Sequence, residues 1–197
     1  MKTIIFSVAF VLSALMQEGC AQPSNNTSAN ATTQIKASSI RLEQSKDSVA
    51  VKDPLNGVLS AYLALKNALT ADDGTTAQAS AKTMLDKIGK VPMDKMTSDQ
   101  HTLWMKYIKK LTYDATHISE TDHVEHQREH FITLSKNIYD VEKGFGTNSE
   151  TLYYQYCPMA NDGKGAYWVS EKEKISNPFL GKKMPTCGST KETLKVK

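Results

Sequence analysis

The chain has few cysteines, few aromatic residues and no strong excess of charge of one sign. Three cysteines in 197 residues are too few for a disulfide-dense scaffold. Lys and Arg number 24 against 21 Asp and Glu, a formal net charge of +3, and this mixed charge gives no reason to propose a nucleic-acid partner. Hydrophobic residues make up 40% and charged residues 23%, which is ordinary for a folded soluble protein.

The N-terminus carries an apolar run that is short for a membrane span. Lys2 precedes about a dozen mostly apolar residues that end at Met16, a pattern typical of a secretory signal peptide. We therefore expect residues 1–21 to be a signal peptide and the mature protein to have no transmembrane span. Gly19-Cys20-Ala21 leaves two processing routes open, cleavage before Gln22 or lipidation of Cys20 as in a bacterial lipoprotein. The expected location is the periplasm or the membrane surface of a Gram-negative-type envelope.

Residues 22–48 differ in composition from the rest of the chain. They are mostly Ser, Asn, Thr, Gln and Ala, with too few apolar groups to offset the entropy of ordering, which predicts a flexible linker. Residues 49–197 then form a single globular domain. About 150 residues suffice for one hydrophobic core.

Apolar residues recur at helical spacing over residues 53–143. Asp53-Pro54 predicts a helix start, and an apolar stripe continues from there as far as Leu69; a second, Ala-rich stripe begins near Thr76. Thr97 to Gln100 reads as a capping box before a stripe that contains Trp104, expected in the core. A fourth stripe runs to Gly144. Four amphipathic helices with short connections predict a mainly α fold, an up-and-down four-helix bundle.

Residues 147–190 have a different character. Aromatic and turn-forming residues predict short strands and loops, with strands at Leu152 to Tyr156 and Ala166 to Ser170. The expected fold is therefore a helical bundle with a small irregular β/loop element at its C-terminal end.

Four of the five histidines fall within fourteen residues: His117, His123, His126 and His130. His126 and His130 are one helical turn apart, and His123 lies near them. An i,i+4 histidine pair can chelate a divalent ion, since both imidazoles project the same way. The alternative is a solvated helix face with no ligand.

The C-terminal cysteines each have a methionine close in sequence, Cys157-x-Met159 and Met184-x-x-Cys187. Two thiolates and two thioethers form a soft ligand set, which selects monovalent copper or silver. In an oxidising compartment, however, Cys157 and Cys187 are also a candidate disulfide that closes a loop of about 30 residues. The residues alone favour the disulfide slightly, and both interpretations stay open.

Several C-terminal motifs resemble the domain of unknown function 3347 (DUF3347) family. They are Tyr-Cys-Pro-Met-Ala from Tyr156, Gly-Ala-Tyr-Trp-Val-Ser from Gly165, and Asn-Pro-Phe-Leu-Gly-Lys-Lys-Met-Pro-Thr-Cys-Gly from Asn177. The stretch from Gln127 to Ser135 is similar to the family's fourth-helix pattern. The resemblance covers about residues 50 to 195, with departures at Ser176, Phe179 and Pro185.

The resemblance implies an association with metals. The domain occurs in exported bacterial proteins and at the end of some copper/silver efflux adaptor proteins, which strengthens the metal hypothesis. We therefore expect an exported, non-enzymatic binding protein for copper(I) or silver(I), with a metal-efflux adaptor or another envelope protein as partner. The candidate ligands are Cys157, Met159, Met184 and Cys187, with His123, His126 and His130 as further candidates. Tyr156, Tyr167 and Trp168 would shield the ion.

A different function is expected if the two cysteines are paired. The domain would then be a disulfide-stabilised module that contacts another envelope protein and binds no metal. No combination of nucleophile, base and oxyanion-binding groups is recognisable in the sequence.

Overall fold

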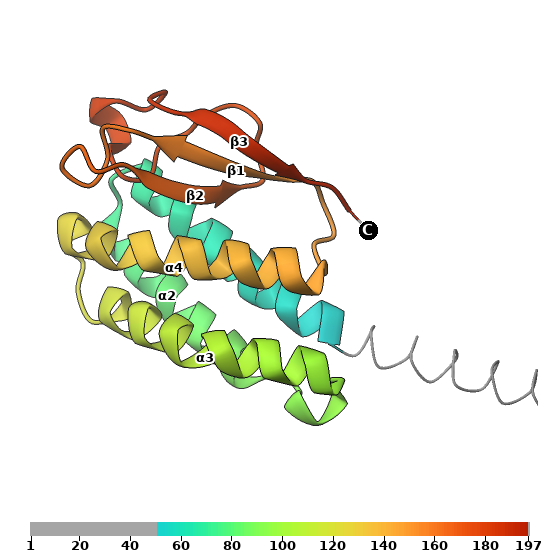
Figure 1. Cartoon of the computed structure of the whole chain (residues 1–197). Helices are drawn as coiled ribbons and strands as arrows, with labels where there is room; N and C mark the ends of the chain where they lie inside the picture. Colours follow the sequence, from blue (N-terminus) through green and yellow to red (C-terminus); the bar gives the residue numbers. More distant parts are fainter. Residues whose placement is uncertain (1–50, 197) are drawn as a thin grey trace, which may run out of the picture. The chain divides into compact units, whose positions relative to one another are not determined.

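The computed structural model describes residues 51–196. The predicted signal peptide, the linker and Cys20 lie outside the described residues. The described chain is helical over residues 51–70 and then forms helices α2 (Gly74–Gly89), α3 (Ser98–Ser119) and α4 (Val124–Phe145). Strands β1 (Leu152–Cys157), β2 (Ala166–Ser170) and β3 (Ser189–Leu194) come after them (Figure 1).

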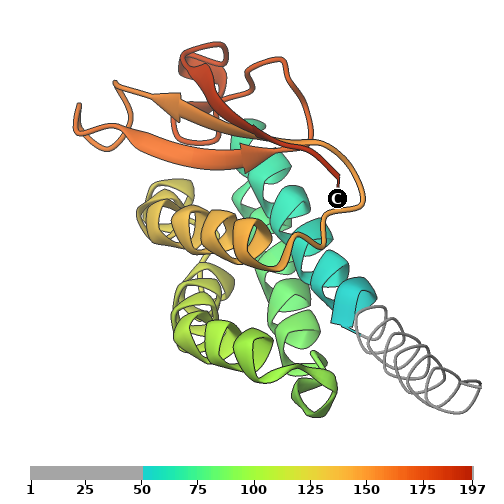
Figure 2. The same cartoon turned by 45° about the vertical axis from the view of Figure 1, so that its right-hand side comes forward.

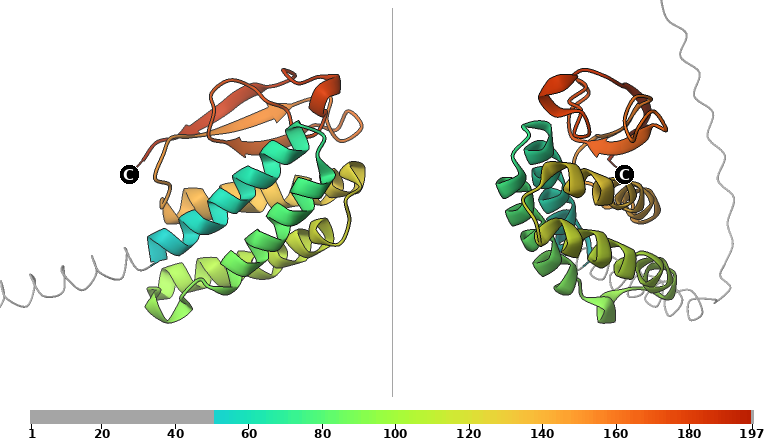
Figure 3. Two further views of the ribbon diagram at one scale, coloured as in Figure 1. Left: turned by 180° about the vertical axis from the view of Figure 1, so that it is seen from behind. Right: turned by 90° about the vertical axis from the view of Figure 1, so that its left-hand side faces the viewer.

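Successive helices run in opposite directions, as Figure 2 shows. The fold is therefore the predicted mainly α up-and-down bundle with a small β element. Figure 3 shows three layers: α2 and α3 form one, the first helix and α4 form the middle one, and the sheet covers the other side of the middle layer. No helix within residues 51–196 is both long and apolar enough to span a membrane.

The sheet is antiparallel, in the order β2-β1-β3. β1 and β2 lie at the positions of the two predicted strands. They pair with each other, Tyr154 with Val169 and Tyr156 with Tyr167. β3 was not predicted, because its sequence Ser-Thr-Lys-Glu-Thr-Leu is mostly polar and exposed. Its pairing with β1 shifts register between Tyr154 and Gln155.

Most of the predicted helix signals are confirmed. The Thr97 side chain accepts a hydrogen bond from the Gln100 backbone amide, and the Gln100 side chain accepts one from the Thr97 backbone amide, so the predicted capping box is complete. Trp104 is fully buried, as expected. The predicted start at Asp53 is wrong, because residues 51 and 52 are already helical. Val51 is fully buried and lies one turn before the buried Leu55, so packing of the apolar stripe outweighs the local capping signal.

Arg128 joins α4 to two segments that are far from it in the sequence, residues 69–72 and the loop at Pro178. Its Nε donates to the Pro178 carbonyl at 2.7 Å, and its Nη2 donates to the Leu69 carbonyl at 2.9 Å and pairs with Asp72. Asp72 also accepts from the Lys182 amide. Gly181 has φ +49° and its backbone lies against this pair, so a Cβ at residue 181 would clash with Asp72.

Glu142, in the last turn of α4, is a buried carboxyl. It is 2% exposed, and its Oε2 has no hydrogen-bond partner among the described residues. Burial raises the pKa of Glu142 to about 7, against a smaller lowering by the Thr147 hydroxyl. A carboxyl whose pKa is higher in the folded than in the unfolded state destabilises the fold as the pH rises from the unfolded-state pKa to the folded-state pKa.

We expect Glu142 to lower the free energy of unfolding by about 2 kcal/mol between about pH 5 and about pH 8. Glu142→Gln should remove this part of the pH dependence and leave the stability near pH 5 almost unchanged. Urea unfolding at both pH values measures it, with the exposed Glu150→Gln as control. A pH dependence equal to that of wild type in Glu142→Gln would contradict the assignment.

Candidate metal centre

The structure joins Cys157 and Cys187 in a disulfide. Cys157 ends β1 and is fully buried, whereas Cys187 lies in the loop before β3, where its carbonyl accepts from the Asn177 side chain at 2.8 Å. Sulfurs bonded to each other are not thiolate ligands. In this state the chain therefore presents the disulfide and not the two thiolates on which the copper(I) or silver(I) hypothesis depends.

The two methionines of the predicted sulfur cluster lie at the surface. Met159 is 54% exposed and Met184 is 39% exposed. Met159 comes shortly after β1 and lines a pocket with Glu125 and Glu129 of α4. Both thioethers are thus accessible to solvent, and their role as ligands stays a prediction for the reduced protein.

The aromatic residues near the disulfide occupy two different environments. Trp168 is fully buried and packs edge-on against Phe179, with ring centroids 6.1 Å apart. Tyr167 is 40% exposed, and its ring lies 4.9 Å from Tyr154 and 4.4 Å from Tyr156. Trp168 therefore belongs to the core, while Tyr167 is stacked on Tyr154 and tilted against Tyr156.

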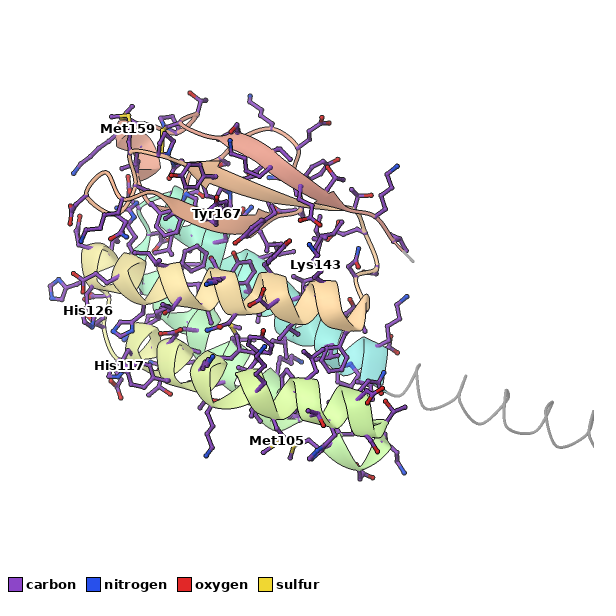
Figure 4. The ribbon with its side chains drawn as sticks, in the orientation of Figure 1. Met105, His117, His126, Lys143, Met159 and Tyr167 are labelled. Carbon is purple, nitrogen blue, oxygen red and sulfur yellow. A yellow bond between two sulfur atoms is a disulfide. The ribbon has the colours of Figure 1, made fainter. Side chains whose placement is uncertain are left out.

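Three histidines meet where α3 and α4 join. His117, from the last turn of α3, stacks in parallel on His130 of α4 with ring centroids 4.5 Å apart. His126 lies edge-on to His130 at 5.0 Å. One ring nitrogen from each of the three lies within 4.8 Å of the others. Figure 4 shows His117 and His126 at this end of the two helices.

The composition of this histidine cluster (His117, His126 and His130) differs in part from the sequence prediction. His126 and His130 are brought together as the i,i+4 spacing indicated. His123 is not part of the cluster, because it is the N-cap residue of α4. His117 takes its place, and it comes from the neighbouring helix.

Each histidine of the cluster has a carboxylate near its Nδ1 atom. His130 Nδ1 lies 3.5 Å from Asp114 Oδ1, His126 Nδ1 3.2 Å from Glu129 Oε2, and His117 Nδ1 3.6 Å from Glu120 Oε2. Carboxylates in this position orient metal-binding imidazoles and raise their basicity.

Asp114 is the most buried of the three carboxylates, with its side chain 6% exposed. Burial raises the pKa of Asp114, while hydrogen bonds from Thr133 and His130 lower it in part. The Thr133 hydroxyl donates to Asp114 at 2.8 Å. Asp114 is thus fixed from α4, and a cation bound by the adjacent imidazoles would favour its ionised form.

The ring nitrogens need to move only slightly to share one ion. Zinc–nitrogen bonds of 2.0–2.1 Å place two nitrogens about 3.4 Å apart in a tetrahedral site, so nitrogens that now lie up to 4.8 Å apart would approach each other by about 1.4 Å. The His117 and His126 side chains are 36% and 48% exposed, which gives them room to adjust. Three imidazoles with an open fourth position suit zinc, copper and nickel.

The family model "Protein of unknown function (DUF3347)" matches residues 58–150. This range includes the histidine cluster and ends before β1, so the sulfur residues lie outside it. No curated protein and no solved structure matches the chain.

Proposed function

The chain belongs to the DUF3347 family through residues 58–150, and we propose that it is an exported protein that binds a heavy-metal ion at His117, His126 and His130. The observation that carries this proposal is the convergence of three imidazole nitrogens within 4.8 Å. The carboxylates beside their Nδ1 atoms support it, because histidines of a metal site commonly have such partners. The role is binding, and no catalytic step is assigned.

Copper(II) is the ion we expect to bind most tightly. Imidazole ligands suit several first-row divalent ions, and affinity generally rises along the series to copper(II) and falls at zinc. The proposed handling of copper(I) or silver(I) by the sulfur residues requires a reduced Cys157 and Cys187. These sulfur residues would form a second metal site, separate from the histidine cluster.

The disulfide supports the proposed export. Structural disulfides persist in oxidising compartments and are rare in the cytosol. A periplasmic or lipid-anchored protein is therefore compatible with the Cys157–Cys187 bond. The same bond favours the alternative function, a disulfide-stabilised module that contacts an envelope protein through exposed residues such as Tyr167.

Replacing His117 or His130 by Gln is expected to weaken copper(II) binding at least about tenfold, which corresponds to about 1.4 kcal/mol. Each substitution removes one of three ligands and keeps a side chain of similar size. A competition titration with a chromogenic chelator on the full chain measures the affinity. His101→Gln and His123→Gln are the matched controls, because both residues are exposed and lie outside the cluster.

Asp114→Asn tests whether the cluster is a built site or a set of surface histidines. Loss of a carboxylate that orients a ligand typically weakens metal binding about 10–100-fold. Equal copper(II) affinity in wild type, His117→Gln, His130→Gln and Asp114→Asn would overturn the proposal and favour the metal-free module. Melting curves of the apo-proteins separate a loss of ligand from a loss of fold.

A further inference from the structure

A groove lies between α3 and α4, next to the histidine cluster. Its volume is about 680 Å³, within the range of small-molecule sites, about 300–1,000 Å³. The lysines along it come from both helices: Lys106, Lys109 and Lys110 from α3, and Lys136 from α4. The groove is therefore lined by lysine side chains from both of the helices that form it.

The positive charge of the groove is not neutralised by ion pairs. Within residues 51–196 the lysine ion pairs involve Lys66, Lys90, Lys95 and Lys143, and none of these lines the groove. Its two carboxylates have other contacts: Asp140 accepts from the Tyr107 hydroxyl at 3.1 Å, and Asp114 accepts from Thr133. None of the four lysines of the groove therefore has an ion-pair partner among these residues.

The groove also offers aromatic surface. The ammonium groups of Lys106 and Lys110 lie 5.1 Å and 5.6 Å from the centroid of the Tyr107 ring. Tyr113 is 59% exposed and its ring lies edge-on to His117 at 4.5 Å. An organic anion with a carbon skeleton can therefore contact the exposed Tyr113 ring and the lysine charges together, which a hydrated inorganic ion cannot.

The groove and the histidine cluster share residues. Asp114 lines the groove and also contacts His130, and Tyr113 packs against His117. The lysines of the groove add an electrostatic cost to cation binding at the histidine cluster, since like charges repel. A bound anion would remove that cost, and one with several carboxylates matches ammonium groups on both walls.

We propose that the groove between α3 and α4 binds a small organic polycarboxylate, held by Lys109 and Lys136 from opposite walls and lying beside the metal of the histidine cluster. The neighbouring metal is the one part that rests on the proposed function. The anion site itself is formed by the lysines and tyrosines, and it is testable in the metal-free protein.

Isothermal titration of citrate into the metal-free full chain at low ionic strength tests the proposal. Wild type should bind citrate saturably, and the double variant Lys109→Gln/Lys136→Gln should bind it at least about tenfold more weakly, because two charged hydrogen-bond donors are lost. Lys82→Gln/Lys174→Gln is the matched control, with the same charge change at exposed residues outside the groove. Its affinity should stay within about twofold of wild type.

Acetate and inorganic phosphate, titrated in parallel, test the chemical class. Both should bind much more weakly than citrate, and phosphate binding as tight as citrate binding would overturn the polycarboxylate assignment. Absence of saturable citrate binding, or an equal loss in both double variants, would overturn the site itself. Copper(II) titration without citrate measures the histidine cluster alone, so failure of one proposal is distinguishable from failure of the other.

Discussion

Replacing Cys157 and Cys187 together by Ala is expected to lower the free energy of unfolding by about 3–4 kcal/mol. The disulfide closes a loop, with a sequence separation of 30 residues, and its loss increases the conformational entropy of the unfolded chain. It also connects the end of β1 to the loop before β3, so the sheet loses a covalent link. Urea unfolding monitored by circular dichroism measures the change.

Wild type treated with a thiol reductant is the natural control for this variant. It should lose a similar amount of stability, because reduction breaks the same cross-link without changing the side chains. Met159→Leu and Met184→Leu should leave the unfolding free energy within about 0.5 kcal/mol of wild type, since both residues lie at the surface. A double alanine variant as stable as wild type would contradict a structural role for the disulfide.

The same variants distinguish the sulfur site from the disulfide. If the four sulfurs act together, copper(I) titration of the fully reduced protein against a competing chelator should show tight binding. This binding should be lost without the two cysteines and weakened by either methionine substitution. Reduced wild type without tight binding would remove the sulfur site and leave the histidine cluster as the metal centre.

The helical part of the fold was predictable because its signals are local. Buried residues repeat at helical spacing in each of the four helices, and Thr97 and Gln100 cap α3 as their spacing indicates. The start of the first helix was misplaced because Asp53 and Pro54 resemble a cap, whereas burial of Val51 depends on tertiary packing. β3 was missed because its partner β1 is more than thirty residues earlier and its own sequence is polar.

The histidine cluster was predictable only in part, because half of it depends on how two helices pair. His126 and His130 are one turn apart on a single helix. His117 lies on the preceding helix, and the α3–α4 loop is centred near residues 121 and 122. In a short antiparallel helix hairpin, residues at similar distances from the centre of the loop lie at the same level along the two helices. His117 and His126 follow this rule, and Asp114 and His130 follow it to within one residue. It could therefore have placed His117 and Asp114 near the histidine pair of α4.

A buried ion pair between the first helix and the residue after β2 joins the bundle to the sheet. Lys66 Nζ donates to Glu171 Oε2 at 2.7 Å, with side chains 0% and 17% exposed. Burial lowers the pKa of Lys66 in spite of Glu171. Burial would raise the pKa of Glu171, but the hydrogen bond and charge of Lys66 outweigh it and hold that pKa below its ordinary value. The stabilisation by Glu171 is thus present above the ordinary carboxyl pKa and is lost as the pH falls through the lowered one.

Glu171→Gln is expected to lower the free energy of unfolding by about 3–5 kcal/mol near neutral pH, because the fully buried ammonium group of Lys66 loses its counter-charge. Lys66→Met/Glu171→Leu should recover most of this loss, since a well-packed apolar pair replaces a buried ion pair at little or no cost. Asp86→Asn is the control: its pair with Lys90 is exposed and contributes about 0.5 kcal/mol or less. If Glu171→Gln destabilised the protein no more than Asp86→Asn in urea unfolding, the pair would not stabilise the contact between helix and sheet.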